Sequence, residues 1–270
     1  MKMLSKILKY DFKNGITKYW PRYVMASIAV IGILVYSISV YNFWDMQSGS
    51  EVSYSLGDLF IYINKGIEKI IINQNDKFKY PVAYIAKGII LGLLVGEYYH
   101  HECKNMGMKI LISTQSRTLW ITGKILRVLA IPVIYNIMVV FACTLMSGFR
   151  MSVNCDFLTW AGMNIAGMSA GILIVMCVLP FLTDIFFCTF QNFLGLFVNS
   201  HIAFTVVIAV RFISIFYVTI LLPGNWEMLQ RNSQIMEGGI NVYAALVIAI
   251  FAIAGMIGAN IILFRKKDIL

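Results

Sequence analysis

Two histidines, two glutamates and a cysteine lie together in the short stretch Glu97–Cys103. Side chains of these types are common ligands of Zn²⁺. A zinc-protease motif reads H-E-x-x-H, which places two histidines on one helical face. His101 and Glu102 begin that pattern, but Asn105 holds the position of the second histidine. His100 and His101 are adjacent and would point about 100° apart on a helix, so we expect neither a metal site nor catalytic residues here.

The composition indicates what kind of fold positions this stretch. Of 270 residues, 59% are hydrophobic and 13% are charged, whereas soluble domains carry roughly 25% charged residues. Five runs contain no charged residue: Tyr23–Trp44, Val128–Phe149, Phe157–Thr183, Ile185–Val210 and Gly238–Phe264. Each reaches the roughly 20 residues that a helix needs to cross a bilayer. A backbone in lipid must satisfy its own hydrogen bonds, so we predict an all-α integral membrane protein.

A sixth apolar run, Pro81–Gly96, is interrupted only by Lys87, which can snorkel or face the bundle. We therefore predict one membrane domain, residues 1–270, with six transmembrane helices. Asn199–His201 is the predicted turn between the fourth and fifth helices, and Pro180 is expected to kink the fourth. The predicted spans are about 22–44, 81–100, 126–148, part of 160–198, 202–222 and 240–264.

The basic residues set the predicted orientation. Of 22 Lys and Arg residues, 14 precede the first span, lie between the second and third, or close the chain. Lys and Arg favour the cytoplasmic side, so both termini are predicted to be cytoplasmic in the plasma membrane. An even number of spans must then separate the loop near Lys104 from the C-terminus. The predicted outer loops carry Asp45, Glu51, Asp58, Glu68, Asp76, Asp156, Glu227 and Glu237.

Residues 1–20 have the pattern of an amphipathic helix. Lysines occupy one face, and the apolar stripe consists of Leu4, Ile7, Leu8, Phe12 and Ile16. Such a helix lies in the membrane interface and is attracted to anionic lipids. We therefore predict an N-terminal interfacial helix with anionic membrane lipids as partners.

A second amphipathic pattern follows Glu102. Met106, Ile110 and Leu111 form an apolar face flanked by Lys104 and Lys109, which predicts a short surface helix rather than a span. The polar segment STQSR then leads into the third predicted span. A cytoplasmic protein could dock on this loop.

The loop resembles the inner loop of permease subunits of type-2 ABC transporters, the exporter-like class. The matching features are Glu102, Gly107, the segment ILISTQSR ending at Arg117, and Gly123-Lys124. Gln115 stands where that family often has proline. The start of the chain, MLSKILKYDFKNGITKYW, is similar to the elbow helix of these permeases, and ANIILFRKKDIL is similar to their usual ending.

The resemblance implies a transport subunit without enzymatic activity of its own. The chain has no GxxxxGK[ST] phosphate-binding loop, so ATP would be bound by a separate ABC ATPase subunit, and no cofactor is expected. Glu102, Gly107, Arg117 and Lys124 would form the coupling loop to that ATPase. A second permease copy or a related permease would complete the path, and no nucleic-acid partner is expected. The implied cargo is hydrophobic or amphipathic, such as an antimicrobial peptide or a drug.

Asp184 and Arg211 are charged residues inside predicted spans, where charges are rare and costly. In a hairpin of the fourth and fifth helices, Arg211 lies about one turn from the level of Asp184. We predict an intramembrane ion pair that locks these helices, and a role in cargo binding is the alternative. For the whole chain, two other functions stay open: a membrane sensor or assembly subunit without transport, and an intramembrane enzyme. The segment 45–80 could form a small outer helix or a plain connector.

Overall fold

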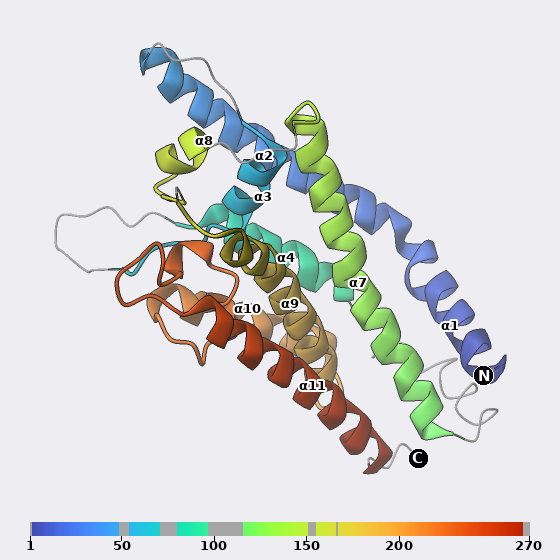
Figure 1. Cartoon of the computed structure of the whole chain (residues 1–270). Coiled ribbons are helices and arrows are strands. Elements are labelled where there is room, and N and C mark those ends of the chain that lie inside the picture. The colour runs from blue at the N-terminus through green and yellow to red at the C-terminus, as the bar shows by residue number, and fades with distance from the viewer. Residues whose placement is uncertain are drawn as a thin grey trace.

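The computed structural model describes residues 2–48, 54–70, 80–96, 116–150, 155–165 and 167–266, and over these residues the chain is helical without β-strands (Figure 1). Its long helices are α2 (Trp20–Ser48), α7 (Arg117–Met146), α9 (Ala170–Leu194) and α11 (Val242–Lys266). The shorter ones are α1 (Lys2–Gly15), α3 (Leu56–Ile63), α4 (Val82–Val95), α8 (Cys155–Trp160) and α10 (Ser200–Phe216).

The bundle has two distinct ends (Figure 1). α1, the start of α7 and the end of α11 gather at the end marked by both chain termini, which we call the terminal end. There the rings of Trp120 and Phe264 stack with centroids 4.9 Å apart. α3, α8 and the connection between α10 and α11 lie at the opposite end, which we call the loop end.

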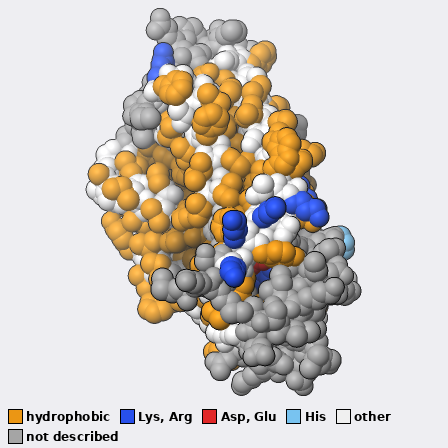
Figure 2. Space-filling model, turned by 90° about the vertical axis from the view of Figure 1, so that its right-hand side faces the viewer, with side chains coloured by type: hydrophobic (Ala, Val, Ile, Leu, Met, Phe, Trp, Pro, Cys, Tyr) orange, Lys and Arg blue, Asp and Glu red, His pale blue; other side chains and the backbone are white. Residues whose placement is uncertain are grey.

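Four helical stretches of the described chain are long and apolar enough to cross a membrane: Lys6–Phe43, Thr118–Met146, Ala170–Leu194 and Val242–Phe264. Much of their apolar surface faces outward, including Phe251, which is 73% exposed. One face of the molecule is almost continuously hydrophobic, with Lys and Arg side chains gathered toward one end (Figure 2). An apolar exterior of this kind suits lipid, and the chain is compatible with a multi-pass membrane protein.

Several observed helices begin or end at other residues than the predicted spans. The third predicted span, 126–148, begins nine residues earlier, at Arg117. The fifth, 202–222, ends at Phe216, and the turn before it lies just ahead of Asn199, which caps α10 by accepting from Ile202 N–H. The sixth runs Val242–Lys266.

The fourth span, predicted within 160–198, corresponds to one helix, α9, and a separate short helix, α8, precedes it. α8 ends at Trp160 and α9 begins at Ala170. Gly162 and Gly167 between them have φ angles of 77° and 80°, a left-handed backbone that glycine adopts without strain. These glycines therefore end one helix before the next begins. Pro180 does lie within α9.

The N-terminal helix is α1, which ends at Gly15, and a 3₁₀ turn, Thr17–Tyr19, joins it to α2. Among residues 6–15 of this helix, Ile7, Asp11 and Gly15 are buried, whereas Phe12 is exposed. The buried stripe is thus offset from the predicted apolar stripe because α1 packs against α7 through an acidic residue.

Within the segment 45–80, residues 56–63 form the helix α3. Ser55 and Asp58 build a capping box at its start: each side chain bonds to the backbone N–H of the other. Such a box satisfies helix N–H groups that otherwise lack partners. Asp58 is fully buried, so the carboxylate serves the helix start and is not presented to solvent.

The connection between α10 and α11, residues 217–241, folds back into the bundle instead of extending outward. We call it the re-entrant segment. Glu227, which the sequence assigned to an outer loop, and Arg231 are fully buried. Non-helical backbone at membrane depth is tolerated where it is enclosed by protein, and here α4, α9 and α10 surround it.

Candidate functional site

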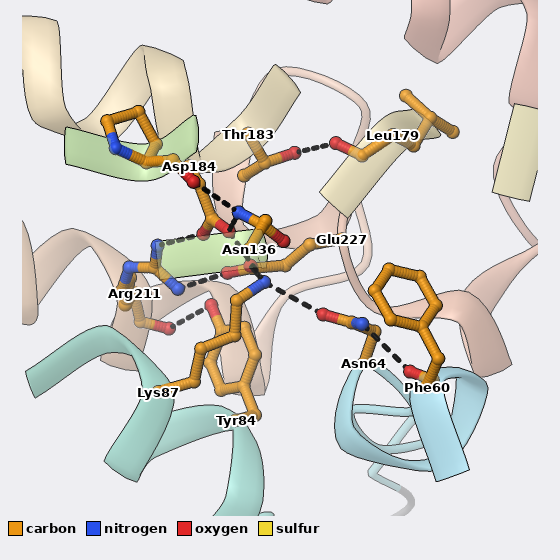
Figure 3. A network of polar contacts seen from close by, with 11 residues as sticks. Phe60, Asn64, Tyr84, Lys87, Asn136, Leu179, Thr183, Asp184, Arg211 and Glu227 are labelled. Atoms are coloured by element: carbon orange, nitrogen blue, oxygen red, sulfur yellow. Dashed lines mark hydrogen bonds and ion pairs between the residues drawn. The ribbon is translucent and has the colours of Figure 1, made fainter. Parts of the chain in front are cut away.

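Four buried charges meet inside the bundle (Figure 3). They are Lys87 on α4, Asp184 on α9, Arg211 on α10 and Glu227 on the re-entrant segment, and each is at most 2% exposed. We call them the charge cluster. Two cations balance two carboxylates, so the cluster is formally neutral.

The four side chains form a ring in which each carboxylate bridges both cations. Lys87 Nζ lies 3.1 Å from Asp184 Oδ2 and 3.0 Å from Glu227 Oε2. Arg211 Nη2 lies 3.4 Å from Asp184 Oδ1, and Arg211 Nη1 pairs with Glu227 Oε1. Opposite charges alternate around the ring, which is the arrangement that best offsets the cost of removing four ions from water.

Neutral side chains add hydrogen bonds to the ring, although Arg211 Nε has no partner among the described residues. Lys87 Nζ donates a third bond to Asn64 Oδ1 at 2.8 Å, which satisfies all three ammonium protons. Asn136 Nδ2 on α7 donates to Asp184 Oδ2 at 3.0 Å. The Arg211 guanidinium also lies over the ring of Phe187, 4.1 Å from its centroid. The cluster therefore joins α3, α4, α7, α9, α10 and the re-entrant segment.

The helices bring these charges together through position and close packing. Asp184 is the fifteenth of the 25 residues of α9, so it lies near mid-helix. α4 and α10 approach closely at Gly88, where a Cβ atom would lie 2.7 Å from Arg211 Cδ. A larger residue there would push the guanidinium out of the ring.

The structure places Asp184 and Arg211 as the sequence suggested, within reach of each other. It adds two members that the sequence reading left out of the pair. Lys87 faces the bundle, one of the two positions considered for it. No sequence pattern indicated that Glu227 joins the cluster, because it lies in a non-helical segment without periodicity. With all four side chains enclosed, this arrangement offers cargo no surface and favours the locking role.

The second polar junction lies at the terminal end, between α1 and α7. Lys124 on α7 pairs with Asp11 on α1, and both side chains are at most 2% exposed. Arg127 Nη2 donates to the carbonyl of Gly15 at 3.1 Å. At Gly123 a Cβ atom would lie 2.7 Å from Ile7 Cγ2, so glycine permits the close approach of the two helices.

Lys124 belongs to this junction between α1 and α7. The sequence assigned Lys124 to a coupling loop, but it lies inside α7 with its ammonium buried against α1. It is positioned to hold α1 rather than to contact a docked partner. Arg117 is the first residue of α7, and Glu102, Gly107 and the histidines of the considered metal site lie outside the described residues.

Reversing one charge of this junction is expected to release α1. Asp11→Lys places two cations together in a buried site, and breaking a buried pair costs about 3–5 kcal/mol. Trypsin cleavage after Lys9 and Lys13 should accelerate at least tenfold, because local opening exposes the helix. The double variant Asp11→Lys/Lys124→Asp should return cleavage close to the original rate, and the exposed Lys18→Asp should leave it unchanged. Equal cleavage in the single and double variants would show that the pair does not hold α1.

The fold and the charge cluster thus describe a helical protein with four long apolar helices, compatible with several membrane passes. Comparisons with protein-family models, curated proteins and solved structures find no match to this chain.

Proposed function

We propose that this chain is the membrane-spanning permease subunit of an ATP-driven exporter of the type-2 ABC class. It would form the translocation path with a second copy or a related permease and work with a separate ATPase. The proposed cargo is hydrophobic or amphipathic, such as an antimicrobial peptide or a drug.

The observation that carries the proposal is the way α7 begins. The residues Gly123 and Lys124, which close the coupling pattern in the sequence, form the contact with α1. Movement of the connection between α4 and α7 would therefore pass directly into α1 and α7. The aromatic stack of Trp120 on Phe264 extends this contact to α11. An ATPase that pushed on the connection would move three helices together.

Six membrane passes are part of the proposal, with α4 and α10 added to the four long helices. Their 14 and 17 residues span about 21 Å and 26 Å, short of the roughly 30 Å of a bilayer core. The re-entrant segment lies over the loop end of both helices and would fill the missing thickness with protein. In this arrangement both termini lie on the cytoplasmic side of the plasma membrane.

The exposed basic residues support that orientation. Lys6, Lys9, Lys13, Lys18 and Arg22 are all exposed at the terminal end. Basic residues at the cytoplasmic surface are attracted to anionic lipids. We propose that α1 and the start of α2 contact such lipids there.

The proposal predicts that an ATPase co-purifies with this chain. The tagged chain would be extracted from its native membranes in mild detergent and assayed for ATP hydrolysis. Scrambling residues 103–117 should abolish the co-purified activity, because the docking surface is lost. Scrambling residues 71–79, in the connection between α3 and α4, should leave it intact. If no hydrolase is captured even after crosslinking, the permease assignment fails. A stable complex whose hydrolysis does not respond to cargo would instead indicate a sensor.

A further inference from the structure

A large cleft opens on the side of the bundle at the loop end, between α2 and α4. Its volume is about 840 Å³, within the range of pockets that hold drug-sized ligands. Its other walls come from the 65–68 segment, the end of α8 and Gln230 of the re-entrant segment. The cleft is separate from the charge cluster, whose four members do not line it.

Five of the 20 residues that line the cleft are aromatic. Tyr36 and Tyr80 lie at the cleft with 69% and 67% of their surfaces exposed. Tyr62 and Trp160 stack against each other with centroids 6.4 Å apart and line it as well. The faces of such rings carry negative electrostatic potential and attract cations, alkylammonium groups in particular.

A carboxylate lies beside these rings. Glu68 lines the cleft and is exposed, and its Oε1 accepts a 2.6 Å bond from Gln230 Nε2. That neutral donor fixes the carboxylate without cancelling its charge. Lys65 also lines the cleft and keeps its charge, but its ammonium donates to the carbonyl of Ala161. Glu68 is exposed whereas Lys65 is half-buried, so the carboxylate is the more accessible of these two charges.

We propose that this cleft binds an amphipathic organic cation, with the apolar body between the tyrosines and the positive charge near Glu68. The lateral position of the cleft suits entry from the lipid. The designation of this ligand as cargo rests on the proposed transport function, whereas binding itself does not need the ATPase.

Tyr84 would couple occupancy of the cleft to the charge cluster. Its side chain lines the cleft, and its hydroxyl donates to the carbonyl of Arg211 at 3.3 Å. The Tyr84 ring also lies 5.7 Å from the Arg211 guanidinium. A cation in the cleft and the cluster would thus share one aromatic wall.

The test measures binding of tritiated tetraphenylphosphonium to the purified chain in nanodiscs of zwitterionic lipid. Tetraphenylborate has nearly the same size and shape with the opposite charge, so it serves as the matched competitor. We expect saturable binding of one cation per chain and little displacement by tetraphenylborate. Equal binding of both ions would overturn the proposal, because it would show a charge-blind apolar groove of the kind that holds lipid tails.

Two pairs of variants locate the site. Glu68→Gln keeps the acceptor for Gln230 but removes the charge, and affinity should fall about five- to tenfold. Glu237→Gln removes a charge from an exposed position outside the cleft and should have no effect. Unchanged affinity in Glu68→Gln would contradict the assigned role.

Filling the cleft is the second test. A Cβ atom at Gly32, which lines the cleft, meets no other atom within 4 Å, and the same is true at Gly255 on α11. Gly32→Phe should abolish binding because the ring occupies the cleft, whereas Gly255→Phe should bind normally. Size-exclusion profiles would establish that all four variants fold. If the original chain binds no cation but an ATPase still co-purifies with it, the cleft proposal alone is rejected. If the chain binds the cation but no ATPase co-purifies, the transport assignment alone is rejected.

Discussion

Replacing Arg211 with methionine is expected to prevent the chain from accumulating as a folded, monodisperse protein. The change leaves Asp184 and Glu227 facing each other with Lys87 as the one remaining cation of the cluster. Removing one partner from a buried ion pair costs about 3–5 kcal/mol, because the other charge stays buried without compensation. That cost is a large fraction of the stability of a typical protein. The yield after size exclusion in detergent and the melting temperature would measure the loss.

A compensating variant separates charge balance from simple loss of packing. Arg211→Met/Glu227→Gln removes one cation and one anion, so Lys87 and Asp184 are left as a balanced pair. We expect the double variant to recover much of the melting temperature. Arg150 is exposed at the loop end, and Arg150→Met should behave like the original chain. A double variant as unstable as the single one would show that geometry, rather than charge balance, makes the cluster essential.

The same variants distinguish locking from a cargo role. If the Arg211 and Asp184 single variants assembled normally but no longer supported transport, the locking role would be wrong. The enclosed ring argues against that result, since each carboxylate already bridges two cations.

The sequence could predict Asp184 and Arg211 as neighbours because helical rise converts spacing into depth. It could not predict Glu227, because no rise relates residue number to depth in a non-helical segment. The usual assumption, that a charged residue after an apolar run is exposed, failed for Glu227 and Arg231. Both side chains are buried because tertiary contacts supply partners for their charges.

Predicted and observed helix boundaries differ for related reasons. Lys124 suggested that the third span began near residue 126, yet α7 starts at Arg117, after the capping residue Ser116. α1 supplies partners for Lys124 and Arg127 within this helix. The charge-free run around Gly162 and Gly167 was read as one helix. The glycines themselves were the available signal for the break, and hydrophobicity outweighed them in the prediction.

The re-entrant segment links the features described above. Glu227 joins the charge cluster, Gln230 lies at the cleft beside Glu68, and Arg231 anchors the segment itself. Any movement of this segment would change the cluster and the cleft together. Its anchor is therefore the point at which one substitution should disturb both.

Arg231 is held by neutral oxygen acceptors, four backbone carbonyls and one side-chain amide, rather than by a carboxylate. Its Nε donates to Ile67 O at 2.8 Å, and Nη2 donates to Ile215 O at 2.5 Å and to Glu68 O at 3.3 Å. Nη1 donates to the carbonyl of Ser214 and to Asn225 Oδ1. A guanidinium keeps its positive charge even when it is buried. The group is still charged at neutral pH, so these five contacts must stabilise it.

Arg231→Met is expected to loosen the re-entrant segment and to weaken cation binding in the cleft. It leaves four main-chain carbonyls and the Asn225 amide without these donors, and each buried group left unpaired costs about 1–3 kcal/mol. Partial entry of water would limit the total to about 3–5 kcal/mol. Hydrogen exchange should rise first in residues 217–241, where the backbone relies on this anchor.

Two further variants make the result specific. Arg231→Lys restores the charge but not the planar fork of five donors, so it should recover only part of the protection. Lys69→Met removes an exposed cation near the same segment and should change neither exchange nor tetraphenylphosphonium binding. If Arg231→Met loosened the segment while the cleft bound the cation with unchanged affinity, Gln230 would not position Glu68. The cleft would then be organised by α2 and α4 alone.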